Sequence, residues 1–222
     1  MYIRMSNNSI KQELYDVLSG RIKIRNGEPL QTIACYLRAS QETSVIAKNA
    51  KQFKREEAQR LKAYAINSGF WIDRIDFENY VSEGAEQRVY LCDSKHVMKL
   101  NDSIYYESWL DYLYNLILHN YFFEDTAYQL TGFTEFEGII YSVVLQNYVF
   151  ETGPTNVKYL NHFLQLNGFE NIRNNDYMHK DLGIILEDLH DENVLTNNGV
   201  LYFIDTVFYL TPVFWKTEGF LN

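Results

Sequence analysis

The sequence predicts an α+β fold, in which a helical N-terminal segment precedes a region that mixes strands and helices. Apolar residues recur at helical spacing over residues 1–78, whereas apolar and polar residues alternate from about residue 88. Beyond residue 79 the expected order is hairpin, helix, strand, helices and short hairpin. Many folds share this order, so motifs are needed to narrow the choice.

Three helices are expected in the N-terminal segment. The first carries a stripe of four apolar residues, namely Ile10, Leu14, Val17 and Leu18. The Asn-Gly-Glu-Pro turn at 26–29 precedes a second helix over about 30–38. A third helix is expected over about 43–67, with Gly69 well suited to its C-terminal cap.

The rest of the chain alternates between strands and helices. Alternating residues predict a hairpin of strands 88–92 and 96–100, joined by a polar turn. A helix over 104–123 and a buried strand over about 138–146 follow. Two more helices and then two short strands complete the prediction: helices 156–167 and 176–186, strands 194–195 and 201–204.

Charge argues against one class of partner. Among the 222 residues, 29 are acidic and 20 are Lys or Arg, which gives a net charge of −9. Nucleic-acid binding needs clustered cations, so binding over the whole surface is not expected. One basic run, over residues 48–62, alternates with Glu56 and Glu57 and is read as a solvated helix face.

Other compositional features indicate a cytoplasmic protein that does not enter a membrane. Hydrophobic residues make up 46% of the chain, enough for a core, but no apolar run is long enough to span a bilayer. The N-terminus lacks the apolar stretch of a secretory signal. Cys35 and Cys92 lie far apart and are read as buried, unpaired hydrophobes.

The residues with the clearest chemical signal are two aspartates and an asparagine near the C-terminus. Asp188 precedes Asn193 by five positions, and Asp205 ends an apolar strand twelve positions later. Phosphoryl transfer needs a carboxylate that orients the acceptor hydroxyl, and an amide and a second carboxylate that hold Mg²⁺. Each of these residues alone is common in turns, so the signal lies in their order and spacing.

Residues 186–195, which include Asp188 and Asn193, resemble the catalytic loop of protein-kinase-like enzymes, in the form HGDLHPGN that small-molecule kinases use. The pair Ile204-Asp205 resembles the strand end and aspartate of the DFG segment. The resemblance implies Asp188 as catalytic base or orienter, Asn193 and Asp205 as metal ligands, and ATP and Mg²⁺ as cofactors. His190 is read as a structural residue of this loop.

The resemblance extends upstream to the nucleotide-binding elements. Residues 82–90 are similar to the phosphate loop of the Rio and Bud atypical kinases, which implies that Gly84, Ala85 and Val89 bind nucleotide. Val97-Met98-Lys99-Leu100 looks like the strand whose lysine contacts the phosphates, which makes Lys99 a catalytic residue. Glu107 is its expected partner.

Two further assignments follow from the same likeness. Gln146 and Tyr148 fall where the adenine-binding hinge is expected. More narrowly, the run GIILEDLHDENVL at 183–195 is close to that of kinase domains in polyvalent proteins of bacterial mobile elements. The implied architecture is a minimal bilobal kinase-like domain over 79–222, with the N-lobe and hinge at 79–150 and a reduced C-lobe at 151–222.

The sequence departs from the kinase pattern in ways that bear on the substrate. The expected loop histidine is replaced by Leu186, and Asp205 is followed by Thr206-Val207 rather than Phe-Gly. Only 17 residues follow Asp205, where an ordinary kinase builds its substrate platform. We therefore expect the helical extension 1–78 to pack on the lobes and to replace part of that surface.

Three functions fit these residues. The first is an ATP/Mg²⁺-dependent phosphotransferase acting on an unknown protein or small-molecule hydroxyl. The second is a catalytically inactive nucleotide-binding pseudokinase or interaction module, which the short C-terminal part favours. The third is nucleotidyl transfer on a kinase-like scaffold. The retained Lys99, Asp188, Asn193 and Asp205 favour the first.

Overall fold

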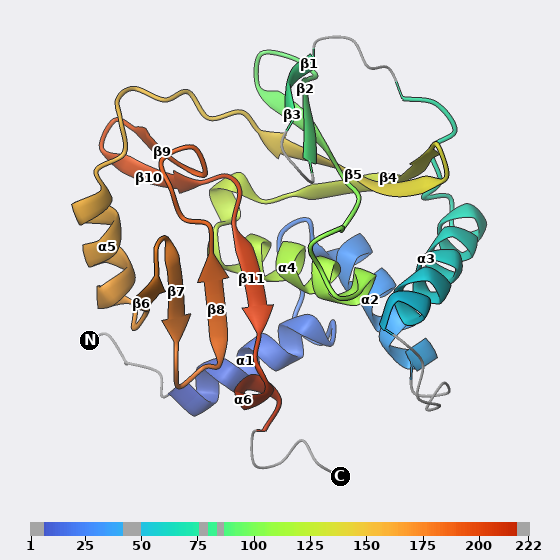
Figure 1. The fold of residues 1–222 in the computed structure, drawn as a ribbon, viewed down its shortest axis with the longest axis horizontal. Coiled ribbons are helices and arrows are strands. Elements are labelled where there is room, and N and C mark those ends of the chain that lie inside the picture. The colour runs from blue at the N-terminus through green and yellow to red at the C-terminus, as the bar shows by residue number, and fades with distance from the viewer. Residues whose placement is uncertain (1–6, 42–49, 76–79, 84–86, 217–222) are drawn as a thin grey trace. The chain divides into compact units, whose positions relative to one another are not determined.

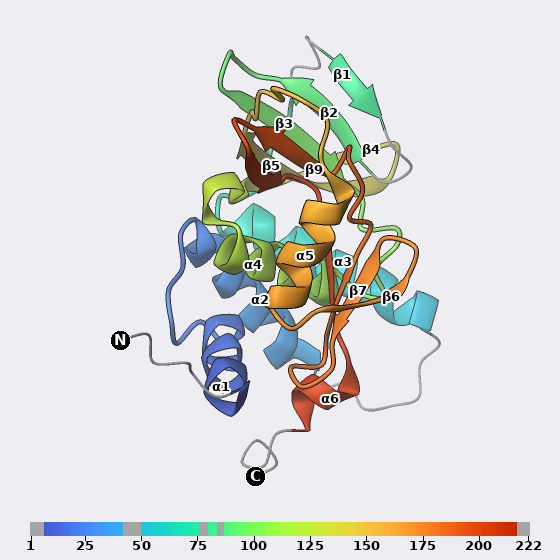
Figure 2. The same ribbon diagram turned by 90° about the vertical axis from the view of Figure 1, so that its left-hand side faces the viewer.

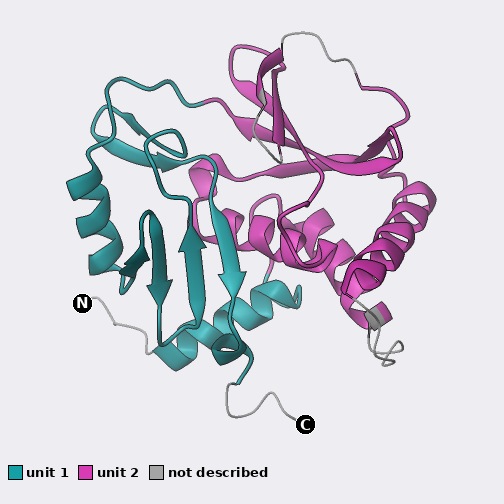
Figure 3. Cartoon of the chain, in the orientation of Figure 1, with its two compact units in different colours: residues 1–22, 149–222 teal, residues 23–148 magenta. Residues whose placement is uncertain are grey.

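The computed structural model describes residues 7–41, 50–75, 80–83 and 87–216. The chain divides into two compact units. Unit 1 consists of residues 1–22 and 149–222, and unit 2 consists of residues 23–148 (Figure 3). The helical segment over 1–78 is therefore shared between the units, with its first helix in unit 1.

Unit 2 is built on a five-stranded antiparallel sheet (Figure 1). Its order is β1-β2-β3-β5-β4, so the two hairpins β2–β3 and β4–β5 meet along β3 and β5. The predicted hairpin and the predicted buried strand are confirmed, while β4 was not predicted. The strands are β1 (Tyr80–Glu83), β2 (Gln87–Leu91), β3 (His96–Asn101), β4 (Gln129–Phe136) and β5 (Ile139–Asn147).

Three α-helices of unit 2 lie on one side of this sheet (Figure 1 and Figure 2). They are α2 (Gly27–Gln41), α3 (Ala50–Asn67) and α4 (Trp109–Phe122), and α4 is followed by the short 3₁₀ helix η1 (Glu124–Thr126). α4 is buried nearly all round, and both α2 and α3 contact it. A helix that is apolar on every side needs such cover.

The sequence prediction started α4 too early, at residue 104. The helix begins at Trp109 because Ser108 is its N-cap, with Oγ accepting the Asp111 backbone N–H at 3.0 Å. The segment between β3 and α4 is not helical and is held in place by hydrogen bonds from α3. Lys54 Nζ donates to the backbone oxygens of Ser103 at 2.5 Å and Tyr106 at 2.6 Å.

The prediction that residues 48–62 form a solvated helix face is wrong for part of α3. Glu57 is fully buried, and its Oε2 accepts the backbone N–H of Trp109 at 2.6 Å. Burial lowers the pKa of Lys54, which lies one turn earlier and faces the same loop. These two side chains fix the start of α4, so they are structural residues of unit 2.

Unit 1 contains a four-stranded antiparallel sheet of order β11-β8-β7-β6 and the hairpin β9–β10. The predicted final hairpin is confirmed, whereas β6 and β11 were not predicted. Its strands are β6 (Glu170–Arg173), β7 (Asp176–His179), β8 (Ile184–Glu187), β9 (Val194–Asn197), β10 (Val200–Phe203) and β11 (Val207–Leu210). Its helices are α1 (Asn7–Leu18), α5 (Val157–Leu166) and α6 (Pro212–Trp215).

The expected helix over 176–186 is wrong, because this segment forms the hairpin β7–β8. Tyr177 pairs with Leu186 and His179 pairs with Ile184, and all four are buried on one face. The only helix-like hydrogen bond is in the turn, where Gly183 N–H donates to His179 O at 2.9 Å. Gly183 has φ +70°, which ends any helical path.

In unit 1 the first helix, α1, packs against α6. Lys11 Nζ donates to Val213 O at 2.7 Å. The Tyr15 and Trp215 rings pack edge to face, with their centroids 6.5 Å apart. α1 therefore covers the segment around α6, which follows the last predicted metal ligand.

Two further expectations can be compared with the described residues. Among them, no helix is both long and apolar enough to cross a membrane. Cys35 and Cys92 are free, as expected, but neither is buried: Cys35 is half-buried on α2, and Cys92 is exposed because it follows β2 at the hairpin turn.

Candidate phosphotransfer site

Asp188 and Asn193 of the predicted catalytic loop and Asp205 of the DFG-like segment lie together in unit 1. Asp188 follows β8, Asn193 precedes β9, and Asp205 follows β10. The hairpin pairs Val194 with Phe203, so its open end brings the flanking residues together. Asp205 N–H accordingly donates to Asn193 O at 3.3 Å.

The amide of Asn193 links this hairpin to Asp188. Its Nδ2 donates to both the backbone oxygen and Oδ2 of Asp188, each at 2.9 Å. With Nδ2 turned toward Asp188, the amide oxygen is directed away from that carboxylate. Asp188 itself is in the left-handed region at φ 62°, a strained conformation that a surrounding network must hold.

The start of the loop is also anchored by Asn175 and by Asp176, the first residue of β7. Asp188 N–H donates to Asp176 Oδ1 at 3.2 Å, and Leu189 N–H donates to Asn175 O at 3.1 Å. Sequence reasoning missed Asp176, because it assigned this residue to a helix. Burial alternates along 176–179, but the residues Asp-Tyr-Met-His do not alternate between polar and apolar, so the sequence held no clear strand signal here.

His190 also supports the Asp188 side chain. Its Nδ1 accepts the Glu192 N–H at 3.3 Å, and its Nε2 lies 3.1 Å from the side-chain nitrogen of Asn193. Nε2 lies 3.3 Å from Asp188 Oδ1. His190 therefore touches the predicted catalytic carboxylate, a contact consistent with its reading as a structural loop residue.

Negative charge accumulates around this loop. Burial raises the pKa of Glu187, and the nearby Asp176 and Asp188 raise it further, while Arg173 opposes them. This concentration of carboxylates favours the binding of a cation near the loop. The described residues contain no group of three or more His, Cys, Asp or Glu side chains that could together hold a metal ion.

The donor set nevertheless fits Mg²⁺. Asn193 and Asp205 offer oxygen ligands from adjacent positions, and Mg²⁺ normally takes one or two protein ligands beside waters and substrate phosphates. A site completed by nucleotide phosphates needs no third protein carboxylate.

The predicted catalytic lysine lies in the sheet of unit 2. Lys99 is 4% exposed and is paired in register with Val89 of β2 and Val144 of β5. Its Nζ lies 5.5 Å from the centroid of the Tyr128 ring. Gly84 and Ala85, which the resemblance assigns to the phosphate loop, lie outside the described residues.

Glu107 is exposed in the segment between β3 and α4. Its charge helps to raise the pKa of Asp111, behind the larger effect of Asp111's own burial. Lys99 is buried, with its Nζ over the Tyr128 ring, and its pairing with Glu107 stays a prediction.

The two expected hinge residues lie at the end of β5. Gln146 is buried, and its Nε2 donates to Thr126 O at 2.7 Å. Tyr148 is exposed, and its backbone N–H donates to Lys95 O at 2.6 Å. Their role in adenine binding stays a prediction.

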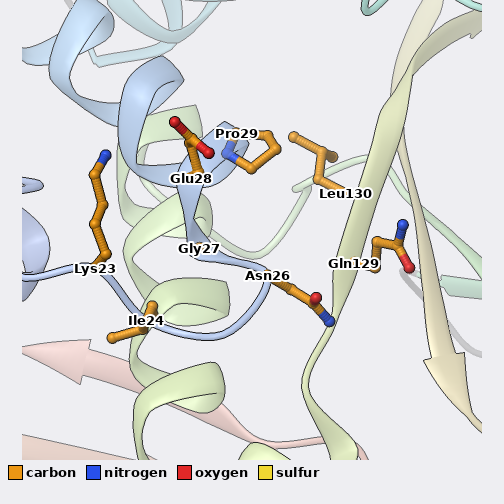
Figure 4. A pocket seen from close by; sticks show the side chains of 8 residues that line it. All are labelled: Lys23, Ile24, Asn26, Gly27, Glu28, Pro29, Gln129 and Leu130. Carbon is orange, nitrogen blue, oxygen red and sulfur yellow. The ribbon is translucent and has the colours of Figure 1, made fainter.

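A separate pocket of about 410 Å³ lies elsewhere in unit 2 (Figure 4). The loop before α2 and the first residues of β4 line it, with Lys23 and Glu28 supplying opposite charges. None of the described residues that line it belongs to the predicted site.

Comparison with known proteins gives one match. The model of a protein family described as the serine/threonine/tyrosine kinase found in polyvalent proteins matches residues 54–212, more than half of the chain. The matched range includes Lys99 and the three residues Asp188, Asn193 and Asp205. No curated protein and no solved structure matches.

Proposed function

The chain belongs to the family of serine/threonine/tyrosine kinases found in polyvalent proteins, and we propose that it is an ATP- and Mg²⁺-dependent phosphotransferase. It is a kinase-like α+β protein. The proposed reaction moves the γ-phosphate of ATP to a hydroxyl of a protein or a small molecule. The observation that carries the proposal is the hydrogen-bonded group of Asp188, Asn193 and Asp205.

Each of these residues has a proposed role. The Asp188 carboxylate, 60% exposed, orients the acceptor hydroxyl and takes its proton. Asn193 and Asp205 hold the metal, and Lys99 binds the phosphates. Bound Mg²⁺ would neutralise the charge that develops on the transferred phosphate.

One observation favours the second candidate, a nucleotide-binding module without turnover. The residues after Asp205 return at once into the sheet, because β11 pairs with β8 from Val207↔Glu187 to Leu210↔Ile184. Residues 207–210 are therefore part of the sheet and do not form a free loop that could bind a peptide. A small or unusual acceptor fits this geometry as well.

Labelled ATP tests these alternatives. Purified protein is incubated with Mg²⁺ and ATP labelled at either the γ- or the α-phosphate, and label transfer and ADP release are measured. We expect transfer from the γ-labelled form alone, lost in Asp205→Ala and retained in the matched loop variant Asp191→Ala. Transfer of the α-label would instead support nucleotidyl transfer.

Melting curves with nucleotide separate binding from turnover. A Mg²⁺-dependent rise in melting temperature that Asp205→Ala removes, without any transfer or ADP release, would favour the non-catalytic module. The absence of both a melting shift and turnover would contradict the proposed function.

A further inference from the structure

Lys99 occupies a strongly desolvated environment within unit 2. Lys99 is 4% exposed, Tyr128 is 2% exposed and His119 is fully buried. Burying an ammonium group is costly unless nearby groups stabilise the charge. The surroundings of Lys99 should therefore contain a group that favours its charged form.

The Tyr128 ring is such a group. Lys99 Nζ lies 5.5 Å from the ring centroid, within the range of a cation–π interaction. The negative face of an aromatic ring attracts a cation, and this attraction is strongest where water is excluded.

The ring is held in place through its backbone. Tyr128 N–H donates to Asn120 Oδ1 at 2.7 Å, and Asn120 Nδ2 donates to Tyr128 O at 2.8 Å. Asn120 belongs to the buried helix α4, so the position of the ring is coupled to that helix.

His119 packs against the same ring without adding a second positive charge. Its ring centroid lies 4.5 Å from that of Tyr128, and its Nε2 lies 3.0 Å from Thr126 O. Burial, with a smaller contribution from the charge of Lys99, lowers the pKa of His119 to about 3, against the opposing hydrogen bond to Thr126. At neutral pH His119 is therefore uncharged and does not repel Lys99.

We propose that Tyr128 is a positioning residue for Lys99: its ring face holds the ammonium group in place for the nucleotide phosphates. The role of Lys99 toward phosphate rests on the proposed function, whereas the contact between Lys99 and Tyr128 does not. In this arrangement an aromatic face contributes to positioning that the family likeness assigns to the carboxylate of Glu107.

A graded series of rings at position 128 tests the proposal. Tyr128→Phe is compared with phenylalanines carrying one, two or three ring fluorines, which weaken the negative face with little change in size. The same substitutions at Phe133, a buried ring that packs on Trp109, control for fluorination itself. Folding of every variant is checked by its melting temperature.

The first readout needs neither nucleotide nor activity. The titration midpoint of the Lys99 amine is followed by NMR of its ε-carbon. We expect the midpoint to fall stepwise along the series, by about one pH unit between phenylalanine and the trifluoro ring. The Phe133 series should leave it unchanged. A midpoint that does not follow the number of fluorines at position 128 would overturn the proposal.

The second readout concerns the reaction. Holding Lys99 improves phosphate binding equally before and during transfer, so the KM for ATP should rise about tenfold along the series while kcat changes less than about twofold. A graded midpoint with no turnover in any variant would leave the Lys99–Tyr128 contact established and count against the proposed function alone. An equal loss of kcat in all four variants would indicate a merely structural ring.

Discussion

In unit 2 the Lys99 side chain is 4% exposed and lies over an aromatic ring, whereas in unit 1 the Asp188 side chain is 60% exposed and is held by hydrogen bonds from Asn193. Lys99 is immobilised by burial among packed side chains. Asp188 is held by a polar loop whose backbone is strained at φ 62°. In the proposed reaction, each region would hold its own functional group by a different physical means.

This contrast implies different responses to substitution. Changes around Lys99 remove packing or leave buried polar groups unpaired, so they should lower the free energy of unfolding. Changes in the Asp188 loop remove exposed contacts, so they should lower turnover with little effect on stability. Each prediction below tests one side of the contrast.

The largest stability effect is expected for Glu57→Ala in unit 2. The substitution leaves the Trp109 N–H without its buried acceptor and opens a cavity at the start of α4. Together these should cost about 3 kcal/mol of unfolding free energy, measured by urea denaturation. Glu56→Ala, the neighbour that pairs with the exposed Gln52, should cost about 0.5 kcal/mol or less. Equal losses of unfolding free energy in the two variants would contradict a structural role for Glu57.

A pH-dependent effect of intermediate size is expected from His119. Its folded-state pKa of about 3 lies below the ordinary value of 6.5, so the unfolded chain takes up the proton first as the pH falls. The unfolding free energy should therefore drop by about 1.4 kcal/mol per pH unit from about pH 6.5 toward pH 3 because of this residue.

His119→Gln removes this titration while retaining a donor for Thr126. The difference in unfolding free energy between wild type and variant should therefore change over this pH window, since other groups titrate equally in both proteins. A difference that stays constant with pH would show that His119 is protonated in the folded state.

A smaller effect, on turnover rather than stability, is expected for His190→Ala in unit 1. Losing the group 3.3 Å from Asp188 Oδ1 should lower kcat about tenfold, because the carboxylate is less well oriented. The melting temperature should change little. His162→Ala, an exposed histidine of the same unit, should leave kcat unchanged.

The parts of the fold that could be predicted from sequence have local signals. The hairpin β2–β3, the strand β5 and the helix α5 follow from periodicity and turn residues within a few positions. The hairpin β7–β8 was missed because its two four-residue strands, Asp-Tyr-Met-His and Ile-Ile-Leu-Glu, do not alternate between polar and apolar residues. There the local pattern also fits a helix.

Site residues were predicted where a motif fixes their spacing. Asp188, Asn193 and Asp205 are close in sequence and meet at one hairpin. Tyr128 lies far along the chain from Lys99, and Glu57 lies far from Trp109, so no spacing rule could reveal either contact. Such contacts depend on how α3 and α4 pack beside the sheet.

The most direct test of the central claim is a comparison of ATP turnover in wild type, Asp188→Asn and Asp191→Asn. Asp188 and Asp191 are both exposed aspartates of one loop, with side chains 60% and 70% exposed. If Asp188 is the catalytic carboxylate, kcat should fall at least about a hundredfold in Asp188→Asn and less than about twofold in Asp191→Asn. Equal turnover in the two variants would contradict the account.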